Sequence, residues 1–164
     1  MEVETGWRRS AFRRRPETIL SRNHFMKVLV MDDHEGFRQE VMNMLAKHGH
    51  VPEGAATAEE AKALVESGDF DFVLVDYSMP VHDGLWFMQH VKRPRSTKAL
   101  LVTAHVDRQM INRMFAVGIC GYLIKPFDDE DLQRHLEFYS RDTRTHAGTM
   151  HATTAGPSQG GTQP

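Results

Sequence analysis

The stretch FVLVDYSMPVHDG, residues 72–84, decides the fold that we expect for this chain. It begins with a short apolar run rich in β-branched side chains, which is typical of a buried parallel strand. The run ends at Asp76, and Pro80 and Asp83-Gly84 then indicate a constrained loop before the next amphipathic segment. In an open α/β sheet, ligands bind at the carboxyl ends of the strands. Asp76 is therefore predicted to face such a site, although an aspartate after a strand can also merely cap a helix.

Four other segments repeat this pattern of a short apolar run followed by helical apolar spacing. The five expected strands are residues 27–31, 51–55, 72–75, 99–102 and 121–124. The helix before the last strand has its apolar spacing at Met110, Met114, Phe115 and Val117. Short crossovers between buried strands require a parallel sheet that is covered on both faces. The predicted fold class is α/β, a doubly wound five-stranded parallel sheet of the (βα)5 type, with Pro52 placing its strand at an edge.

Composition divides the chain of 164 residues into three parts. Residues 1–25 carry six arginines and three glutamates, and we expect a flexible basic arm that is solvated rather than bound to nucleic acid. Residues 26–140 carry 12 basic and 18 acidic side chains and have the length of one domain. Residues 141–164 are rich in Thr, Gly, Ser, Gln, Ala and Pro, so we expect a disordered polar tail.

The cysteine content and the hydropathy pattern indicate the cellular compartment. A single cysteine, Cys120, excludes an intramolecular disulfide and fits a reducing compartment. No apolar stretch approaches the roughly 20 residues of a membrane span, and no apolar segment follows the arginine-rich start to make a secretion signal. We therefore expect a cytoplasmic protein without a membrane partner.

Polar side chains follow the apolar runs directly, at the expected carboxyl ends of the strands: Asp32, Asp33, Asp76, Thr103 and Lys125. Three carboxylates in one pocket repel each other unless a cation neutralises them. Oxygen ligands without a cluster of His or Cys favour Mg²⁺, which binds few carboxylates together with a phosphate. Lys125 as a point charge and Thr103 as a donor suit a phosphoryl group. Asp76 is then the candidate nucleophile, since a carboxylate can accept phosphoryl as an acyl phosphate.

Four fragments, taken in order, carry a resemblance to a known family. They are VLVMDD (28–33), FVLVDYSMPVHDG (72–84), LLVTA (100–104) and GYLIKPF (121–127). Together they resemble the receiver domain of two-component response regulators, over about residues 26–140, and the chain is similar to the single-domain chemotaxis regulators. The resemblance implies a flavodoxin-like receiver fold.

The resemblance also implies roles for the residues of the site. Asp76 is the implied phosphoacceptor. Asp33 and Asp76 are implied to hold Mg²⁺ together with the main-chain carbonyl of Ser78, while Asp32 orients a water on the metal. Lys125 is implied to pair with the phosphoryl group, through a Lys-Pro bond that resembles the cis bond of the family.

A second implied group concerns switching and the lifetime of the phosphoryl group. Thr103 and Tyr122 resemble the family's switch pair, in which the hydroxyl moves to the phosphoryl oxygen and the ring turns into the vacated space. Ser78 and His105 lie two residues beyond the phosphoacceptor and the switch hydroxyl, and we expect them to set the phosphoryl lifetime. For His105, a role as catalytic base competes with that of an ordinary histidine in an exposed loop.

The implied phosphoryl donor is a sensor histidine kinase or a His-containing phosphotransfer protein, and the downstream protein target is not named by the sequence. Because no output domain has room after residue 140, we expect a stand-alone receiver that is not an enzyme beyond its own phosphorylation and dephosphorylation. Its output should be binding, to a target or a second copy, through the helix from about Asp107, the strand with Tyr122 and the last helix.

Three alternatives from other classes stay open. One is a phosphatase with an aspartyl nucleophile, for which Ser78 stands where haloacid dehalogenase-type enzymes have a second acid. Another is a degenerate receiver that acts as a constitutive interaction module. The third is a flavodoxin-like electron carrier, which is disfavoured because Asp32-Asp33 stands in place of a glycine-rich phosphate loop.

Overall fold

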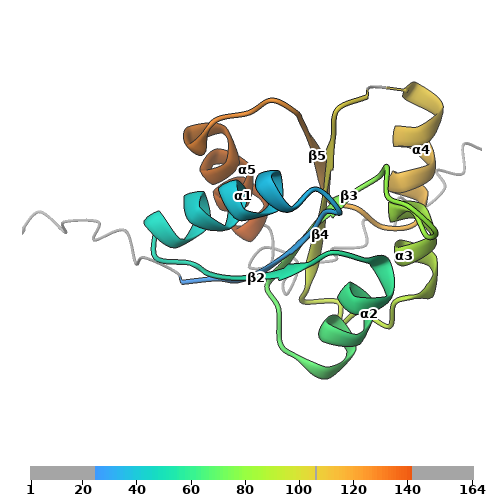
Figure 1. Cartoon of the computed structure of the whole chain (residues 1–164), viewed down its shortest axis with the longest axis horizontal. Coiled ribbons are helices and arrows are strands. Elements are labelled where there is room, and N and C mark those ends of the chain that lie inside the picture. Colours follow the sequence, from blue (N-terminus) through green and yellow to red (C-terminus); the bar gives the residue numbers. More distant parts are fainter. Residues whose placement is uncertain (1–24, 106, 142–164) are drawn as a thin grey trace, which may run out of the picture.

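Five strands and five helices alternate along the chain in the computed structural model, which describes residues 25–105 and 107–141 (Figure 1). The strands are β1 (Lys27–Met31), β2 (Val51–Ala55), β3 (Phe72–Asp76), β4 (Lys98–Thr103) and β5 (Gly121–Ile124). The helices are α1 (Glu35–Lys47), α2 (Ala58–Ser67), α3 (Gly84–His90), α4 (Arg108–Ala116) and α5 (Asp129–Arg141).

All strand pairs are parallel, and the strand order is β2-β1-β3-β4-β5. β3 lies in the centre and all five of its residues are buried, as its continuous apolar run predicts. β2 lies at an edge, as Pro52 predicts. The predicted doubly wound (βα)5 fold, flavodoxin-like, is confirmed. Between β1 and β3 the winding of the chain reverses direction, and ligands bind at such a switch point in open α/β sheets.

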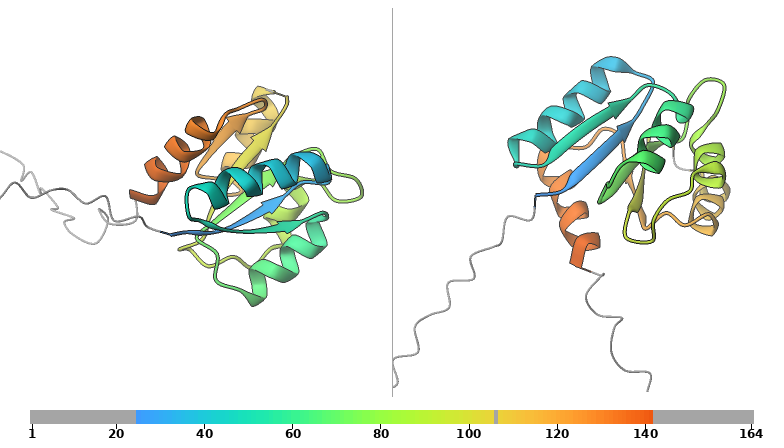
Figure 2. Two further views of the ribbon diagram at one scale, coloured as in Figure 1. Left: turned by 60° about the vertical axis from the view of Figure 1, so that its left-hand side comes forward. Right: turned by 90° about the horizontal axis from the view of Figure 1, so that it is seen from below.

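The helices form a layer on each side of the sheet (Figure 2). α1 and α5 cover one face, where Val41, Leu45, Leu132 and Leu136 pack against the side chains of alternate strand residues. α2, α3 and α4 cover the other face in a second buried cluster. Because both faces are covered, the strand ends and their loops are the part of the sheet that is left to bind a ligand.

Local signals set most helix boundaries. The Thr57 hydroxyl accepts from the Glu60 N–H at 3.1 Å, and the Glu60 carboxylate accepts from the Ala56 N–H, one residue before the position expected in a capping box. α3 ends at His90, with Val91 as its C-cap, before the chain reaches Pro94.

One residue that the helical spacing assigned to the core is exposed. Phe115 is 44% exposed, whereas Met110, Ile111 and Met114 form the buried face of α4. Successive residues of a helix lie about 100° apart, so Phe115 falls beside the buried stripe instead of on it. Its ring meets the Tyr122 ring edge-on at 6.4 Å.

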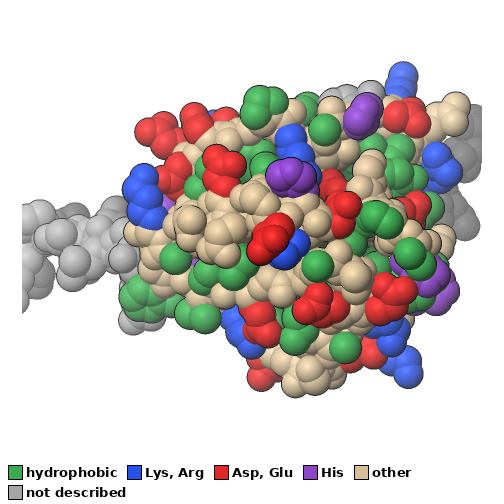
Figure 3. Space-filling view, viewed as in Figure 1, with side chains coloured by type: hydrophobic (Ala, Val, Ile, Leu, Met, Phe, Trp, Pro, Cys, Tyr) green, Lys and Arg blue, Asp and Glu red, His purple; other side chains and the backbone are tan. Residues whose placement is uncertain are grey.

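The predicted basic arm (1–25) and polar tail (141–164) lie outside the described residues, apart from Phe25 and Arg141. Among the helices of residues 25–105 and 107–141, none is long and apolar enough to cross a membrane. Acidic and basic side chains are interspersed over the face shown in Figure 3, and the acidic ones are more numerous there.

Candidate functional site

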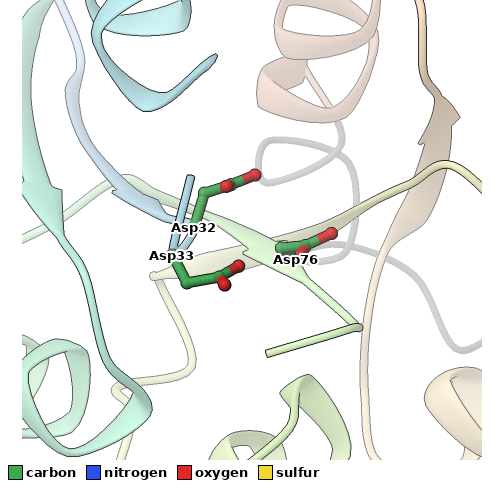
Figure 4. Close-up of side chains that lie close together, drawn as sticks. All are labelled: Asp32, Asp33 and Asp76. Atoms are coloured by element: carbon green, nitrogen blue, oxygen red, sulfur yellow. The ribbon is translucent and has the colours of Figure 1, made fainter. Parts of the chain in front are cut away.

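Three carboxylates meet where β1 and β3 end. Asp32 and Asp33 follow the last residue of β1, and Asp76 is the last residue of β3. β1 and β3 are paired in register, with Met31 opposite Val75, so the two strand ends lie side by side. One oxygen from each carboxylate lies within 4.8 Å of the others. Figure 4 shows the three side chains leaving the strand ends toward the same side.

The three carboxylates differ in exposure and in support. Asp32 and Asp76 are buried, with 2% and 6% exposed, while Asp33 is exposed. Asp32 is held by its neighbours: its Oδ1 accepts from the His34 N–H at 2.8 Å, and its carbonyl accepts from Arg38 Nη1 at 2.7 Å. The pocket therefore has a fixed, buried floor and one carboxylate that solvent reaches.

Lys125, which directly follows β5, contacts both buried carboxylates. Its Nζ lies 2.6 Å from Asp32 Oδ2 and 3.2 Å from Asp76 Oδ1, and its side chain is 18% exposed. The Lys125 N–H donates to the Thr103 carbonyl at 2.9 Å, which extends the contact between the β4 and β5 ends. The peptide bond from Lys125 to Pro126 is cis.

The charges in the pocket are unbalanced. The pKa of Asp76 lies above its ordinary value, first because burial penalises the charged form. The Lys125 ammonium lowers this pKa and the Asp32 and Asp33 carboxylates raise it further. One ammonium thus faces three carboxylates, an arrangement that a divalent cation would neutralise.

The donor set fits Mg²⁺. Three carboxylate oxygens close together, without a His or Cys ligand among them, match the preference of this ion for oxygen. The exposed Asp33 leaves an open side for the waters that Mg²⁺ retains. The acidic triad is therefore consistent with a magnesium site.

The loop after Asp76 is tightly constrained. The Gly84 N–H donates to the Tyr77 carbonyl at 3.0 Å, and the Asp83 carboxylate caps α3 by accepting from the Trp86 N–H at 2.8 Å. A Cβ on Gly84 would lie 2.5 Å from the Asp76 carbonyl oxygen, so this close approach requires glycine. Ser78, the predicted carbonyl ligand, lies exposed in this loop.

The other predicted residues are placed nearby without direct contact to the carboxylates in the described contacts. Thr103 is buried at the end of β4, and its hydroxyl donates to the His105 carbonyl and accepts from the His105 N–H. Tyr122 is 37% exposed and packs against Phe115. The side chain of His105 is exposed. Only Asp32, Asp33, Asp76 and Lys125 are thus brought together as one cluster among the predicted residues.

Two aromatic side chains at this cluster were missed by the sequence reasoning. The Lys125 Nζ lies 4.1 Å from the centroid of the Phe37 ring, and Phe127 meets Phe37 edge-on at 5.7 Å. The helical spacing of α1 assigns Phe37 to the core, and it gives no sign of an ammonium over the ring. The contact joins residues far apart in sequence, which local patterns do not report.

The comparisons with known proteins agree with this geometry. The family described as "Response regulator receiver domain" matches residues 28–137. Chemotaxis protein CheY-3 of Vibrio cholerae is 32% identical over 125 residues, which cover 74% of this chain and 95% of that protein. Chemotaxis protein CheY of Pseudomonas aeruginosa is 31% identical over 118 residues, which cover 68% of this chain and 94% of that protein.

Solved structures show the same likeness. Chemotaxis protein CheY4 of Vibrio cholerae superposes with a TM-score of 0.66 and 33% identity, over 70% of this chain and 98% of that one. The response regulator TrrA of Thermotoga maritima, in complex with Mg(2+)-BeF, superposes with a TM-score of 0.62 and 25% identity, over 70% and 98% of the two chains. By fold, acidic pocket and sequence, the chain belongs to the response regulator receiver domain family.

Proposed function

We propose that this chain is a phosphorylation-switched binding module in which Asp76 accepts a phosphoryl group. The donor is a sensor histidine kinase or a His-containing phosphotransfer protein, in keeping with the family. The observation that carries the proposal is the position of the Lys125 ammonium, in contact with both the Asp32 and the Asp76 carboxylates. A nucleophile, a cation site and a group that can pair with phosphoryl therefore lie within contact distance.

The transfer moves one phosphoryl group between two proteins. An Asp76 carboxylate oxygen forms the new bond to phosphorus while the bond to the donor histidine nitrogen breaks, and that nitrogen keeps the electron pair. Asp32, Asp33 and Asp76, with the main-chain carbonyl of Ser78, would hold Mg²⁺. When bound, the metal neutralises the negative charge that develops on the phosphoryl oxygens. Lys125 exchanges its contact with Asp76 for one with a phosphoryl oxygen, which keeps its charge paired.

The readout of phosphorylation is a change at the end of β4. In this structure the Thr103 hydroxyl makes two hydrogen bonds within its own loop, both with the backbone of His105. In the proposed switch the Thr103 hydroxyl turns to the phosphoryl oxygen, and the exposed Tyr122 ring rotates into the space that is vacated. Ser78 and His105 flank the path of the attacking water, so they set how long the acyl phosphate lasts.

The output surface is formed by α4, β5 and α5. Four apolar side chains are exposed on these elements: Phe115, Tyr122, Ile124 and Phe138. Burial of such side chains drives association, so a downstream protein or a second copy of the chain would bind here. We infer that residues 26–140 form the receiver unit, that it acts in the cytoplasm, and that it does not turn over an external substrate.

Phosphoryl loading tests the proposal directly. Incubation with acetyl phosphate and Mg²⁺ should add one phosphoryl group, detected by intact-protein mass spectrometry, and Asp76→Asn should abolish the addition. Asp71→Asn is the matched control, because it also replaces a carboxylate with an amide. Asp71 lies at the opposite end of β3, where its carboxylate accepts from the Lys27 N–H. Loading of Asp76→Asn would mean that another residue accepts the phosphoryl group, and a wild type that never loads would favour a constitutive interaction module instead.

A further inference from the structure

The Lys125 ammonium has a third neighbour besides its two carboxylates. Its Nζ lies 4.1 Å from the centroid of the Phe37 ring, while Asp32 and Asp76 accept from it at 2.6 and 3.2 Å. An ammonium over an aromatic face within about 6 Å of the centroid is attracted by the negative face of the ring. The contact therefore meets the geometric criterion for a cation–π interaction.

The position of Phe37 is fixed by the start of α1. The Phe37 N–H donates to Nδ1 of His34, the N-cap residue, at 3.1 Å. The Phe37 ring is half-buried against the core cluster under α1 and α5, and the Phe127 ring meets it edge-on at 5.7 Å and 85°. Edge-to-face contact is a favoured arrangement for aromatic pairs. The ring is thus held through its backbone and by the perpendicular Phe127 ring, with its face toward Lys125.

The Phe37 ring lies against the Lys125 ammonium without taking its N–H donors away from the carboxylates. Lysine has three N–H donors, and an aromatic face offers no conventional acceptor oxygen that would divert them from Asp32 and Asp76. The Lys125 side chain is only 18% exposed, so the ring also takes a place that water would otherwise fill. A partly desolvated cation–π contact is stronger than an exposed one.

We propose that Phe37 is a positioning residue for phosphoryl transfer, whose ring holds the Lys125 ammonium at the place where the phosphoryl oxygens arrive. The inference rests on the proposed function and adds a residue to it. During transfer Lys125 exchanges one carboxylate contact for a phosphoryl contact, and the Phe37 contact persists through the exchange. A flexible lysine side chain then loses less conformational freedom when it pairs with the phosphoryl group.

The first readout does not need phosphorylation. In the full chain, NMR of the Lys125 side chain should show resonances displaced by the ring current of Phe37 and restricted motion at the ε-carbon. Phe37→Leu retains an apolar side chain but removes the ring, so both signatures should be lost. Phe37→Tyr retains the ring and should restore them. If Phe37→Leu leaves the Lys125 side chain unchanged, the inference is overturned, whatever the chain does with phosphoryl donors.

The second readout varies the negative potential of the ring face in steps while the shape of the ring stays nearly the same. Mono-, di- and trifluorinated phenylalanine at position 37 weaken the negative face in steps. The rate of loading from acetyl phosphate at saturating Mg²⁺ should fall stepwise, by about fivefold to tenfold over the series, as expected for a partly buried cation–π contact. Unchanged thermal unfolding across the series would show that a merely structural role does not explain the loss.

A second lysine–phenylalanine pair supplies the control. Lys27 Nζ lies 4.3 Å from the centroid of the Phe70 ring, at the opposite end of the sheet from the pocket. The same fluorinated residues at position 70 weaken an equivalent contact, and they should leave the loading rate unchanged. An equal loss of rate from positions 37 and 70 would overturn the inference, as would a flat series at position 37 in a chain that loads.

The two readouts separate this inference from the proposed function. If the wild-type chain does not load but the order of the Lys125 side chain depends on the Phe37 ring, the proposed function fails and the placement of Lys125 by Phe37 stands. If the chain loads normally and neither readout responds to Phe37, the positioning role fails alone.

Discussion

Two lysines at opposite ends of the sheet make the same kinds of contact in different surroundings. Lys27, at the amino end of β1, lies 3.3 Å from Glu53 and over the Phe70 ring, and both partners of this ion pair are more than a third exposed. Lys125, at the carboxyl end, pairs with Asp32 and Asp76 and lies over Phe37, and these side chains are far less exposed. Burial, and not the types of residue, distinguishes the two ends.

The difference shows why chemistry is placed at one end only. An exposed ion pair is solvated by water in either state, so it contributes little to stability and forms no prepared site. Buried carboxylates lose that solvation and depend on the single ammonium, which leaves them ready to bind a divalent cation or a phosphoryl group.

The turns at the amino end are also relaxed, with glycine at the positive φ of Gly49 and Gly118. At the carboxyl end Val81 has φ 68, the one non-glycine residue with positive φ in the described part of the chain.

The largest expected contrast comes from removing each lysine. Lys125→Met leaves two buried carboxylates without their ammonium, and it should lower the free energy of unfolding by about 2–4 kcal/mol in magnesium-free buffer near neutral pH. Lys27→Met should cost less than about 1 kcal/mol. Urea unfolding measures both. Added Mg²⁺ should restore part of the loss in Lys125→Met and none in Lys27→Met, and equal losses from the two variants would contradict the role of burial.

Asp76→Asn should stabilise the chain while it abolishes loading. Because burial raises the pKa of Asp76, the folded state holds its proton more tightly than the unfolded state. Wild-type stability therefore falls as the pH rises from below the ordinary aspartate value through the raised pKa, and the variant lacks this fall. Without metal, the two should be equally stable at low pH, and the variant should be the more stable of the two near neutral pH.

The matched change at the amino end sharpens this result. Asp71→Asn retains an oxygen that can accept from the Lys27 N–H, and Asp71 is exposed, so its effect should stay within about 0.5 kcal/mol. The measurement is urea unfolding over a series of pH values. A variant of Asp76 that loses stability with rising pH as the wild type does would show that this carboxyl is not the source of the fall.

Backbone strain provides a third contrast. A β-branched residue at positive φ is strained, so Val81→Gly should raise the free energy of unfolding by about 1 kcal/mol. Gly118→Ala imposes the same kind of strain on a relaxed turn and should lower it by about 1 kcal/mol, with the new Cβ 3.4 Å from Arg93 Nη2. Thermal or urea unfolding gives the signs, and the same sign for both variants would refute the comparison.

The smallest effect on stability near neutral pH concerns Cys120, which lies at the amino end of the sheet just before β5. Burial raises the pKa of its thiol from 9.0 to about 11, so the folded state favours the neutral thiol. The stability that comes from keeping the thiol neutral is lost only as the pH rises from about 9 through about 11. Below that range the native thiol should react with a thiol reagent about a hundredfold more slowly than the urea-unfolded chain, as the lower thiolate fraction requires. Equal rates would show that the thiol is not shielded.

Much of the molecule follows from local patterns. The apolar runs predict five strands, and their lengths and the intervening helical spacing predict a parallel doubly wound sheet. The acids after the first and third runs, and Lys125 after the fifth, predict which side chains share the carboxyl edge, since parallel strands all end there. These inferences succeed because they depend on the chain direction and on a period, both of which can be read along the sequence.

What the sequence determined by itself is the order of elements, the edge at which Asp32, Asp33, Asp76 and Lys125 gather, and the family. The tertiary structure alone decided that Phe37 faces the Lys125 ammonium, that Phe115 is exposed beside Tyr122, and that the pKa of Asp76 rises despite a lysine in contact. A period tells which side of a helix is apolar, but it does not tell what that side meets. The balance between lost solvation and a nearby charge depends on distances across elements, and packing alone sets those distances.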